Sequence, residues 1–316
     1  MSTPTGRFDH LPAFPIPVIT DLGPGSHTED EELDYITMPQ GMATYRAPQL
    51  PEPEALDGHI PAIEALEAVR AALHAASLGR AAGAVSLRSL ARPDLQIVNQ
   101  ALGEGEVSAR ILPDASGAHT QIQESVYTGV WRVIRWQGDQ VVDDCVEVGA
   151  VPPSLLEALQ ADVAQAQRLE RLLDTPAPDG VLNATPLLIE IQGQCRDRAT
   201  LLAAGQTPAA HVINLTLLPM TPLDIAFLDH QLGTGRILIL SRGYGNCRIT
   251  NSLTPDTWRV VYYNSQETVI LNSVEITGLP EVVTAAPEDL VDAEARLADV
   301  LDWMRSAQSG AVETPA

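Results

Sequence analysis

The sequence predicts an α+β protein made of two tandem copies of a small antiparallel sheet with its helices, preceded by an extended, proline-rich N-terminal arm. Three observations predict this fold: segments of the two halves resemble each other in the same order, amphipathic helices alternate with short apolar strands, and nine of the 24 prolines fall within the first 53 residues. The predicted division is an arm over 1–58, a first repeat over 59–178, a second repeat over 179–306 and a disordered tail over 307–316.

The arm combines prolines, acidic residues and scattered apolar side chains. Proline fixes φ and removes a backbone donor, so residues 11–18 are predicted to be extended. The acidic cluster consists of Glu29, Asp30, Glu31, Glu32 and Asp34. A segment of this composition does not fold alone, yet it carries more apolar side chains than a linker needs. Two interpretations stay open: the arm wraps over its own folded domain, or it docks on a partner.

Apolar residues at helical spacing predict three long helices, over residues 61–80, 154–173 and 287–303. Pro61 suits the first turn of the first helix, because proline is compatible with that position. The helices at 154–173 and 287–303 follow corresponding points of the two predicted repeats. They therefore close the repeats in the same way.

The internal repeat is carried by three matched pairs of segments. Residues 94–107 resemble 224–237, the strand around Trp131 resembles that around Trp258, and residues 144–148 resemble 272–276, at offsets of 130, 127 and 128. Each repeat is predicted to run from a short helix through a G-x-G turn into strands and to end in a long helix, and a further strand candidate precedes each repeat, at 84–90 and 211–218. Two such units pack most economically about a pseudo-two-fold axis. A tryptophan repeated in both units is predicted to be a core residue.

The two G-x-G sequences, at Gly103–Gly105 and Gly233–Gly235, are predicted to end helices. A dinucleotide fingerprint needs a strand before the glycines and a helix after them, so that the phosphates meet a helix N-terminus. The predicted order here is the reverse. We therefore expect helix C-caps and no nucleotide site.

Composition excludes several classes of protein. The chain has no lysine, which removes Walker A loops, pyridoxal Schiff bases and Ser-Lys nucleophile pairs. A formal net charge of -22 disfavours generic nucleic-acid binding. Cys145, Cys195 and Cys247 are far apart, and no local zinc or iron–sulfur motif occurs. Without a long apolar run or an apolar leader, we expect a cytoplasmic protein that does not insert into membranes. Without a cofactor or metal motif, we also expect no cofactor and no metal.

The sharpest local pattern is the string Ser-Arg-Gly-Tyr-Gly-Asn-Cys-Arg at residues 241–248. Its glycines and asparagine predict a plain hairpin between two strands. Flanking arginines also suit a partner-contact surface, and a third interpretation is a reactive Cys247 whose pKa is lowered by Arg242 and Arg248. The candidate partner-binding residues are Arg242, Gly243, Tyr244, Gly245, Asn246, Cys247 and Arg248, together with Phe14, Ile16, Val18, Tyr35 and Met38 of the arm. No catalytic residue is predicted.

The string at 243–249, the strand at 258–263 and the Asn-Ser-Gln at 264–266 resemble the C-terminal region of the HupH/HyaF/HoxQ family of [NiFe] hydrogenase maturation proteins. Residues 16–42 of the arm resemble the same family's N-terminus, so the likeness covers nearly the whole chain. The Gly-Tyr-Gly-Asn-Cys-Arg and Tyr-Asn-Ser-Gln strings are its most specific parts.

This resemblance implies a cytoplasmic, chaperone-like accessory factor that is not an enzyme. It implies binding to the iron–sulfur small subunit precursor of the hydrogenase before twin-arginine export, together with other maturation accessory proteins. The alternative is a thiol-dependent enzyme or cluster-handling protein that acts through Cys247.

Overall fold

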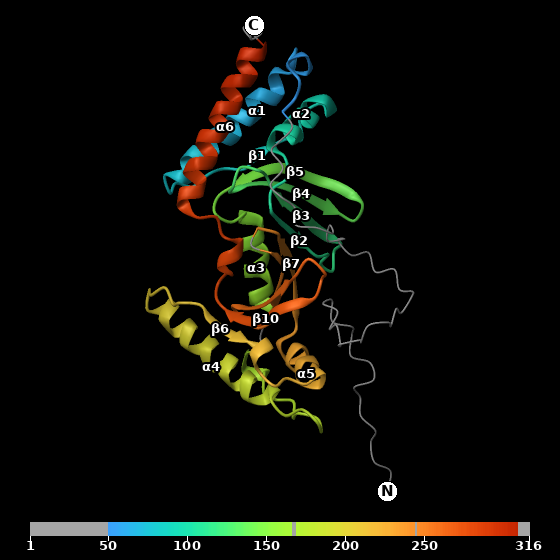
Figure 1. The fold of residues 1–316 in the computed structure, drawn as a ribbon, viewed down its shortest axis with the longest axis vertical. Helices are drawn as coiled ribbons and strands as arrows, with labels where there is room; N and C mark the ends of the chain where they lie inside the picture. The colour runs from blue at the N-terminus through green and yellow to red at the C-terminus, as the bar shows by residue number, and fades with distance from the viewer. Residues whose placement is uncertain (1–49, 166–168, 244, 309–316) are drawn as a thin grey trace.

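The computed structural model describes residues 50–165, 169–243 and 245–308 (Figure 1). Residues 1–49 of the predicted arm, Tyr244 and residues 309–316 of the predicted tail lie outside the described residues, and so do the expectations about them. The protein is α+β, as the sequence predicts.

All described strands belong to one antiparallel sheet, in the order β1-β5-β4-β3-β2-β7-β8-β9-β10-β6. The first half of the chain contributes β1 (Val85–Ser86), β2 (Val107–Ile111), β3 (Ala118–Glu124), β4 (Val130–Gln137) and β5 (Gln140–Val148). The second contributes β6 (His211–Asn214), β7 (Thr234–Ser241), β8 (Asn246–Ser252), β9 (Thr257–Tyr263) and β10 (Val269–Ile276). The two small antiparallel sheets that the sequence predicts are therefore parts of one large sheet, because β2 and β7 join them edge to edge.

The helices occur in the same order in both halves. The first half has α1 (Ile60–Ser77), α2 (Arg92–Leu102) and α3 (Pro153–Gln165), and the second has α4 (Ala184–Ala203), α5 (Pro222–Leu232) and α6 (Pro287–Gln308). Short 3-10 helices lie at η1 (Pro53–Leu56), η2 (Leu169–Arg171), η3 (Leu215–Leu217) and η4 (Glu281–Val283). Helix α4 corresponds to α1 in this order, and the sequence patterns did not predict it.

The junction between β2 and β7 is symmetric. Ala109 stands opposite Ile239, and Val107 opposite Ser241, while Ile111 stands opposite Ile237. Ala109 and Ile239 are separated by 130 residues, the same offset that relates the G-x-G regions of the two halves. Corresponding residues of the two halves therefore meet at the centre of the sheet, as expected at a local two-fold axis.

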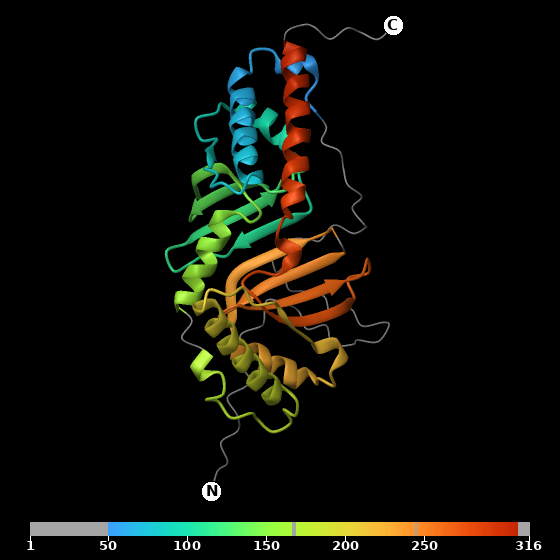
Figure 2. The same ribbon diagram turned by 90° about the vertical axis from the view of Figure 1, so that its left-hand side faces the viewer.

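The two faces of the sheet carry different helices (Figure 1). Leu155 of α3 packs in one cluster with Trp131 and Trp258 from both halves, so we call this side the α3 face (Figure 2). Successive side chains of a strand point to opposite faces, and Arg132 and Arg259 accordingly point to the other side. There they meet Asn99 of α2 and Asp229 of α5, which makes this side the α2/α5 face.

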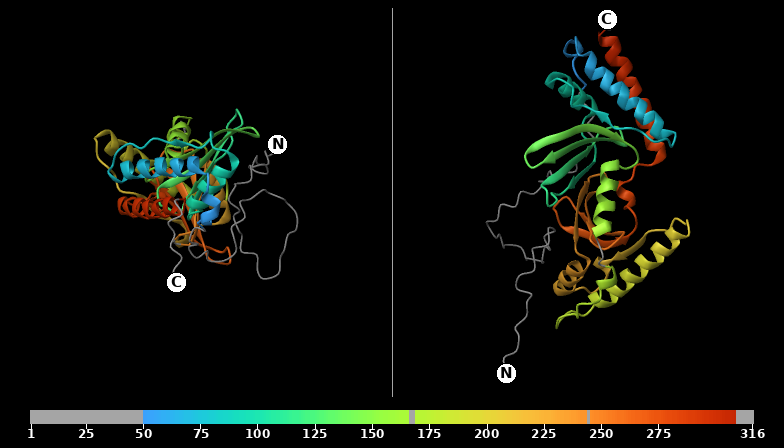
Figure 3. Two further views of the ribbon diagram at one scale, coloured as in Figure 1. Left: turned by 90° about the horizontal axis from the view of Figure 1, so that it is seen from above. Right: turned by 180° about the vertical axis from the view of Figure 1, so that it is seen from behind.

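The last helix of the second half completes the core of the first half. Leu297, Leu301 and Met304 of α6 pack in one cluster with Leu66 and Leu73 of α1, and all five are at most 1% exposed. Figure 3 shows α6 lying alongside α1 in both of its views. The two halves therefore share helices as well as a sheet.

Candidate interaction site

The β7–β8 connection is a hairpin, as one interpretation of residues 241–248 predicts. Ser241 pairs with Cys247, and Gly245 has a φ of 108°, a value that favours glycine. The backbone N–H of Arg242 donates to the carbonyl of Glu106 at 3.1 Å. The Glu106 carboxylate lies directly against Gly243, where it occupies the space that a Cβ would take.

Cys247 is a core residue. Its side chain is 1% exposed and packs on the α3 face with Ile249 and Trp258. Burial raises the pKa of the Cys247 thiol to about 12. The expected lowering of this pKa by the flanking arginines is wrong, because Arg248 points to the opposite face, where its guanidinium lies 5.7 Å from the centre of the Tyr263 ring.

The fold brings the two most specific strings of the family likeness together at one end of the sheet. Asn246 pairs with Tyr263, so the β7–β8 turn lies beside the β9–β10 turn. In the second turn, the side-chain oxygen of Asn264 accepts hydrogen bonds from the backbone N–H groups of Gln266 and Thr268, both at 2.9 Å. This asparagine therefore fixes the shape of the β9–β10 turn.

Exposed apolar side chains border these turns. The backbone N–H of Asn272 donates to the hydroxyl of Thr216 at 2.8 Å, which ties η3 to β10. Leu217 beside it is 80% exposed, Leu218 is 38% exposed, and Ile270 at the start of β10 is 57% exposed. We call the set formed by the described residues 242, 243, 245 and 246, residues 264–268, Leu217, Leu218 and Ile270 the loop end. Its charged, amide and apolar groups suit contact with another polypeptide.

The structure places only some of the predicted site residues at this surface. Of the candidates, Arg242, Gly243, Gly245 and Asn246 lie at the loop end, whereas Cys247 is buried and Arg248 faces the α2/α5 side. Phe14, Ile16, Val18, Tyr35, Met38 and Tyr244 lie outside the described residues. Leu217, Leu218 and Ile270 were missed, although the predicted pairing of consecutive strands could have placed Ile270 at the same end of the sheet as Asn246, with one strand between them.

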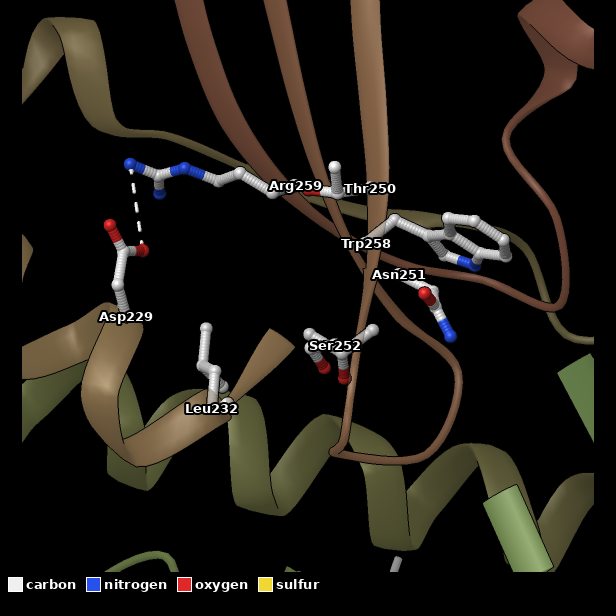
Figure 4. A pocket seen from close by; sticks show the side chains of 9 residues that line it. Asp229, Leu232, Thr250, Asn251, Ser252, Trp258 and Arg259 are labelled. Carbon is white, nitrogen blue, oxygen red and sulfur yellow. Dashed lines mark ion pairs between the residues drawn. The ribbon is translucent and has the colours of Figure 1, made fainter. Parts of the chain in front are cut away.

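A small pocket lies on the α2/α5 face of β8 and β9 (Figure 4). Arg259 and Asp229 are 7% and 5% exposed, and their charged groups lie 3.8 Å apart. Burial raises the pKa of Asp229 and lowers that of Arg259, while the pairing opposes both shifts. The cavity measures about 10 Å³, roughly the space of one water molecule. It is therefore too small for an organic cofactor.

Within the described part of the chain, no three His, Cys, Asp or Glu side chains are grouped as a metal site would require. No helix in the same residues is long and apolar enough to span a membrane.

Comparison with known proteins places this α+β, single-sheet chain in a family. The family model "HupH hydrogenase expression protein, C-terminal conserved region" matches it twice, over residues 60–175 and 181–304. The hydrogenase expression/formation protein HoxQ of Cupriavidus necator is 49% identical over 295 residues, which cover 93% of this chain and 99% of the relative. The hydrogenase-1 operon protein HyaF of Escherichia coli K12 is 35% identical over 295 residues, covering 90% and 96% of the two chains.

A solved structure, the hydrogenase expression protein HupH from Thiobacillus denitrificans, is 30% identical, with a TM-score of 0.34, and covers 38% of this chain and 95% of its own. The sequence matches define the class as hydrogenase expression/formation proteins. The chain belongs to the HupH family within that class.

Proposed function

We propose that this protein is a non-catalytic accessory factor of [NiFe] hydrogenase maturation in the cytoplasm. In this proposal it binds the iron–sulfur small subunit precursor before twin-arginine export, together with other maturation accessory proteins. Family membership supports the maturation role, since the relatives are named hydrogenase expression/formation proteins. We further propose that the two halves arose by internal duplication, which is supported by their common order of elements and by the two family-model matches.

The observation that carries the proposed binding role is the loop end. Two turns that the sequence separates lie side by side there, Ile270 exposes apolar surface after the second turn, and Leu217 exposes more where η3 is tied to β10. Exposed apolar groups beside polar, hydrogen-bonded turns are typical of surfaces that bind other proteins. Binding of this kind needs no reacting group.

The alternative, chemistry at Cys247, has little support. A reactive cysteine needs an accessible thiolate near cationic groups. The Cys247 thiol is buried, and its pKa is raised to about 12, so it is protonated at neutral pH.

The test of the proposed function is co-purification with the small subunit precursor. We expect the unaltered chain to form a complex, and Ile270→Asp to weaken it at least about tenfold in Kd, because a charge would be placed in the apolar part of the contact. Val291→Asp is the matched control, since Val291 on α6 is 56% exposed, nearly the same as Ile270. The proposal is wrong if the unaltered chain binds neither the precursor nor the mature subunit. The loop end is not the contact surface if both variants bind equally well.

A further inference from the structure

A strip of the α2/α5 face lies between α2 and α5, across the middle of the sheet. Ser108, Leu240, Arg248 and Val261 stand opposite one another on β2, β7, β8 and β9, so their side chains share this face. The neighbouring strand positions add Arg110, Leu238 and Tyr263. We call these seven residues the central strip.

The apolar side chains of the central strip are buried although the described helices do not account for their cover. Leu240 is 3% exposed, Val261 2% and Tyr263 6%. None of them belongs to the three apolar clusters that the described residues form with their helices. Beside the strip, α5 contacts β9 through Asp229 and Arg259, and η3 is tied to β10 through Thr216 and Asn272, which stands opposite Val261. A further segment lying on the strip would account for the burial of its apolar side chains.

The strip also carries positive charge that is not balanced locally. Among the described residues, neither Arg110 nor Arg248 forms an ion pair with a carboxylate. The Nε atom of Arg248 is buried and has no hydrogen-bond partner. A buried guanidinium donor without a partner is costly, so its occupant should bring acceptors. Two such arginines in a chain of net charge -22 indicate an acidic occupant.

We propose that the occupant is the chain's own N-terminal segment, residues 1–49. Its acidic cluster at 29–34 would lie by Arg110 and Arg248, and its apolar residues would cover Leu240 and Val261. The segment joins the described chain at Leu50, and 49 extended residues span about 160 Å, which is ample to reach the strip. Of the two interpretations of the arm, this proposal selects wrapping over its own domain. It does not depend on the proposed function.

Hydrogen–deuterium exchange of the full-length chain, read by mass spectrometry, tests this proposal. We expect amides within residues 10–36 to exchange at least about tenfold more slowly than in a synthetic peptide of residues 1–49. The double variant Arg110→Glu/Arg248→Glu should lose that protection. The matched control is Arg80→Glu/Arg88→Glu, which changes the charge equally at two exposed positions away from the strip, and it should keep the protection.

A charge exchange sharpens the test. Adding Glu31→Arg/Glu32→Arg to the strip variant should restore slow exchange in the arm. The exchange of the β9 amides reports whether the sheet of each variant is intact. If these amides exchange faster in the double variant, the single variant Arg110→Glu is used in its place, because Arg110 is only half-buried on the strip.

The proposal is overturned if the arm of the unaltered chain exchanges as fast as the free peptide. It is also overturned if the strip variant keeps full protection. Protection that disappears on dilution would instead assign the strip to a second copy of the chain, and protection that appears only with the hydrogenase subunit would assign it to that partner.

Discussion

Glu124 and Asn251 occupy corresponding places in the two halves. Asn251 accepts a hydrogen bond from the backbone N–H of Ile237 at 2.9 Å, and Glu124 likewise accepts one from that of Val107. The amide of Asn251 is neutral, whereas the carboxyl of Glu124 is ionisable and only 7% exposed. Burial raises the pKa of Glu124 to about 7, and the nearby carboxylates of Glu106 and Asp289 add to the rise.

We predict that Glu124 makes the fold less stable as the pH rises. The folded pKa lies above the ordinary value of 4.5, so the folded state holds a proton that the unfolded state releases between about pH 4.5 and 7. The free energy of unfolding should fall through that window, by no more than about 3 kcal/mol for this group. Glu124→Gln should flatten this part of the pH profile, as measured by urea unfolding from pH 4.5 to 8.5. An unchanged profile in the variant would contradict the prediction.

At the level of single residues, the sequence predicts the tryptophans better than the cysteine. Trp131 and Trp258 are core residues, 2% and 0% exposed, and their indole N–H groups donate to backbone carbonyls. A bulky residue repeated in two strands marks a core position in both. Cys247 was misjudged because Arg248 is its neighbour in sequence but points to the other face of the strand.

The first glycine of each G-x-G turn ends a helix, so the predicted helix C-caps are confirmed. Gly103 ends α2 with a φ of 57°, and Gly233 ends α5 with a φ of 68°. The second glycine of each turn has another role. A Cβ at Gly105 would collide with the backbone carbonyl of Ser125, and one at Gly235 would collide with the side chain of Asn251.

We predict opposite effects for two glycine-to-alanine changes. Gly105→Ala should lower the free energy of unfolding by about 1–3 kcal/mol, because the backbone carbonyl of Ser125 cannot move aside. Gly193→Ala should raise it by about 0.5–1 kcal/mol, because Gly193 lies inside α4, where a Cβ would meet no atom within 4 Å. Chemical denaturation of both variants checks the pair. Equal effects of the two changes would show that the close approach at Gly105 does not matter.

The elements that the sequence patterns missed or overextended have weak local signals. Helix α4 contains Pro186 and Gly193, and its exposed side carries the apolar residues Ile189, Leu201 and Leu202, so its sequence shows little contrast between a polar and an apolar face. The strand candidates at 84–90 and 211–218 shorten to β1 and β6, which lie at the two edges of the sheet. An edge strand pairs on one side only, and its length depends on its single neighbour rather than on its own sequence.

The whole molecule is held together by contacts between its halves. The cluster on the α3 face draws Val133 from the first half and Val260 from the second, and the cluster around α1 includes residues of α6. The first half therefore has no complete core of its own, and the second half shares one of its two clusters with the first. The stability of each half therefore depends on the other half, more than a tandem arrangement of two units suggests.

We predict that the halves unfold together, in one calorimetric transition whose van't Hoff and calorimetric enthalpies agree. Leu297→Ala on α6 should lower the free energy of unfolding by about 2–5 kcal/mol, because Leu297 is fully buried against the first half. The variant should still unfold in a single transition at a lower temperature. Two resolved transitions, with only one of them moved by the variant, would show that the halves unfold separately.

The joining of the two sheets could not be predicted from the sequence. From the sequence alone, β2 and β7 could equally well be the edge strands of two different sheets. Their pairing links residues about 130 positions apart, and no local pattern indicates it. The duplication predicted a two-fold axis between the halves, but it did not predict which strands of the two halves meet at that axis. Ala109 and Ile239 identify those strands only once the register is known.

The position of α6 at the end of the described chain has a consequence for folding during synthesis on the ribosome. Leu66 and Leu73 of α1 emerge early, yet their packing partners on α6 are among the last described residues to be translated. A nascent chain must therefore keep the apolar side of α1 uncovered, or shielded by a general chaperone, for most of its synthesis. A product truncated before α6 would leave that side uncovered and is expected to aggregate or be degraded more readily than the full chain.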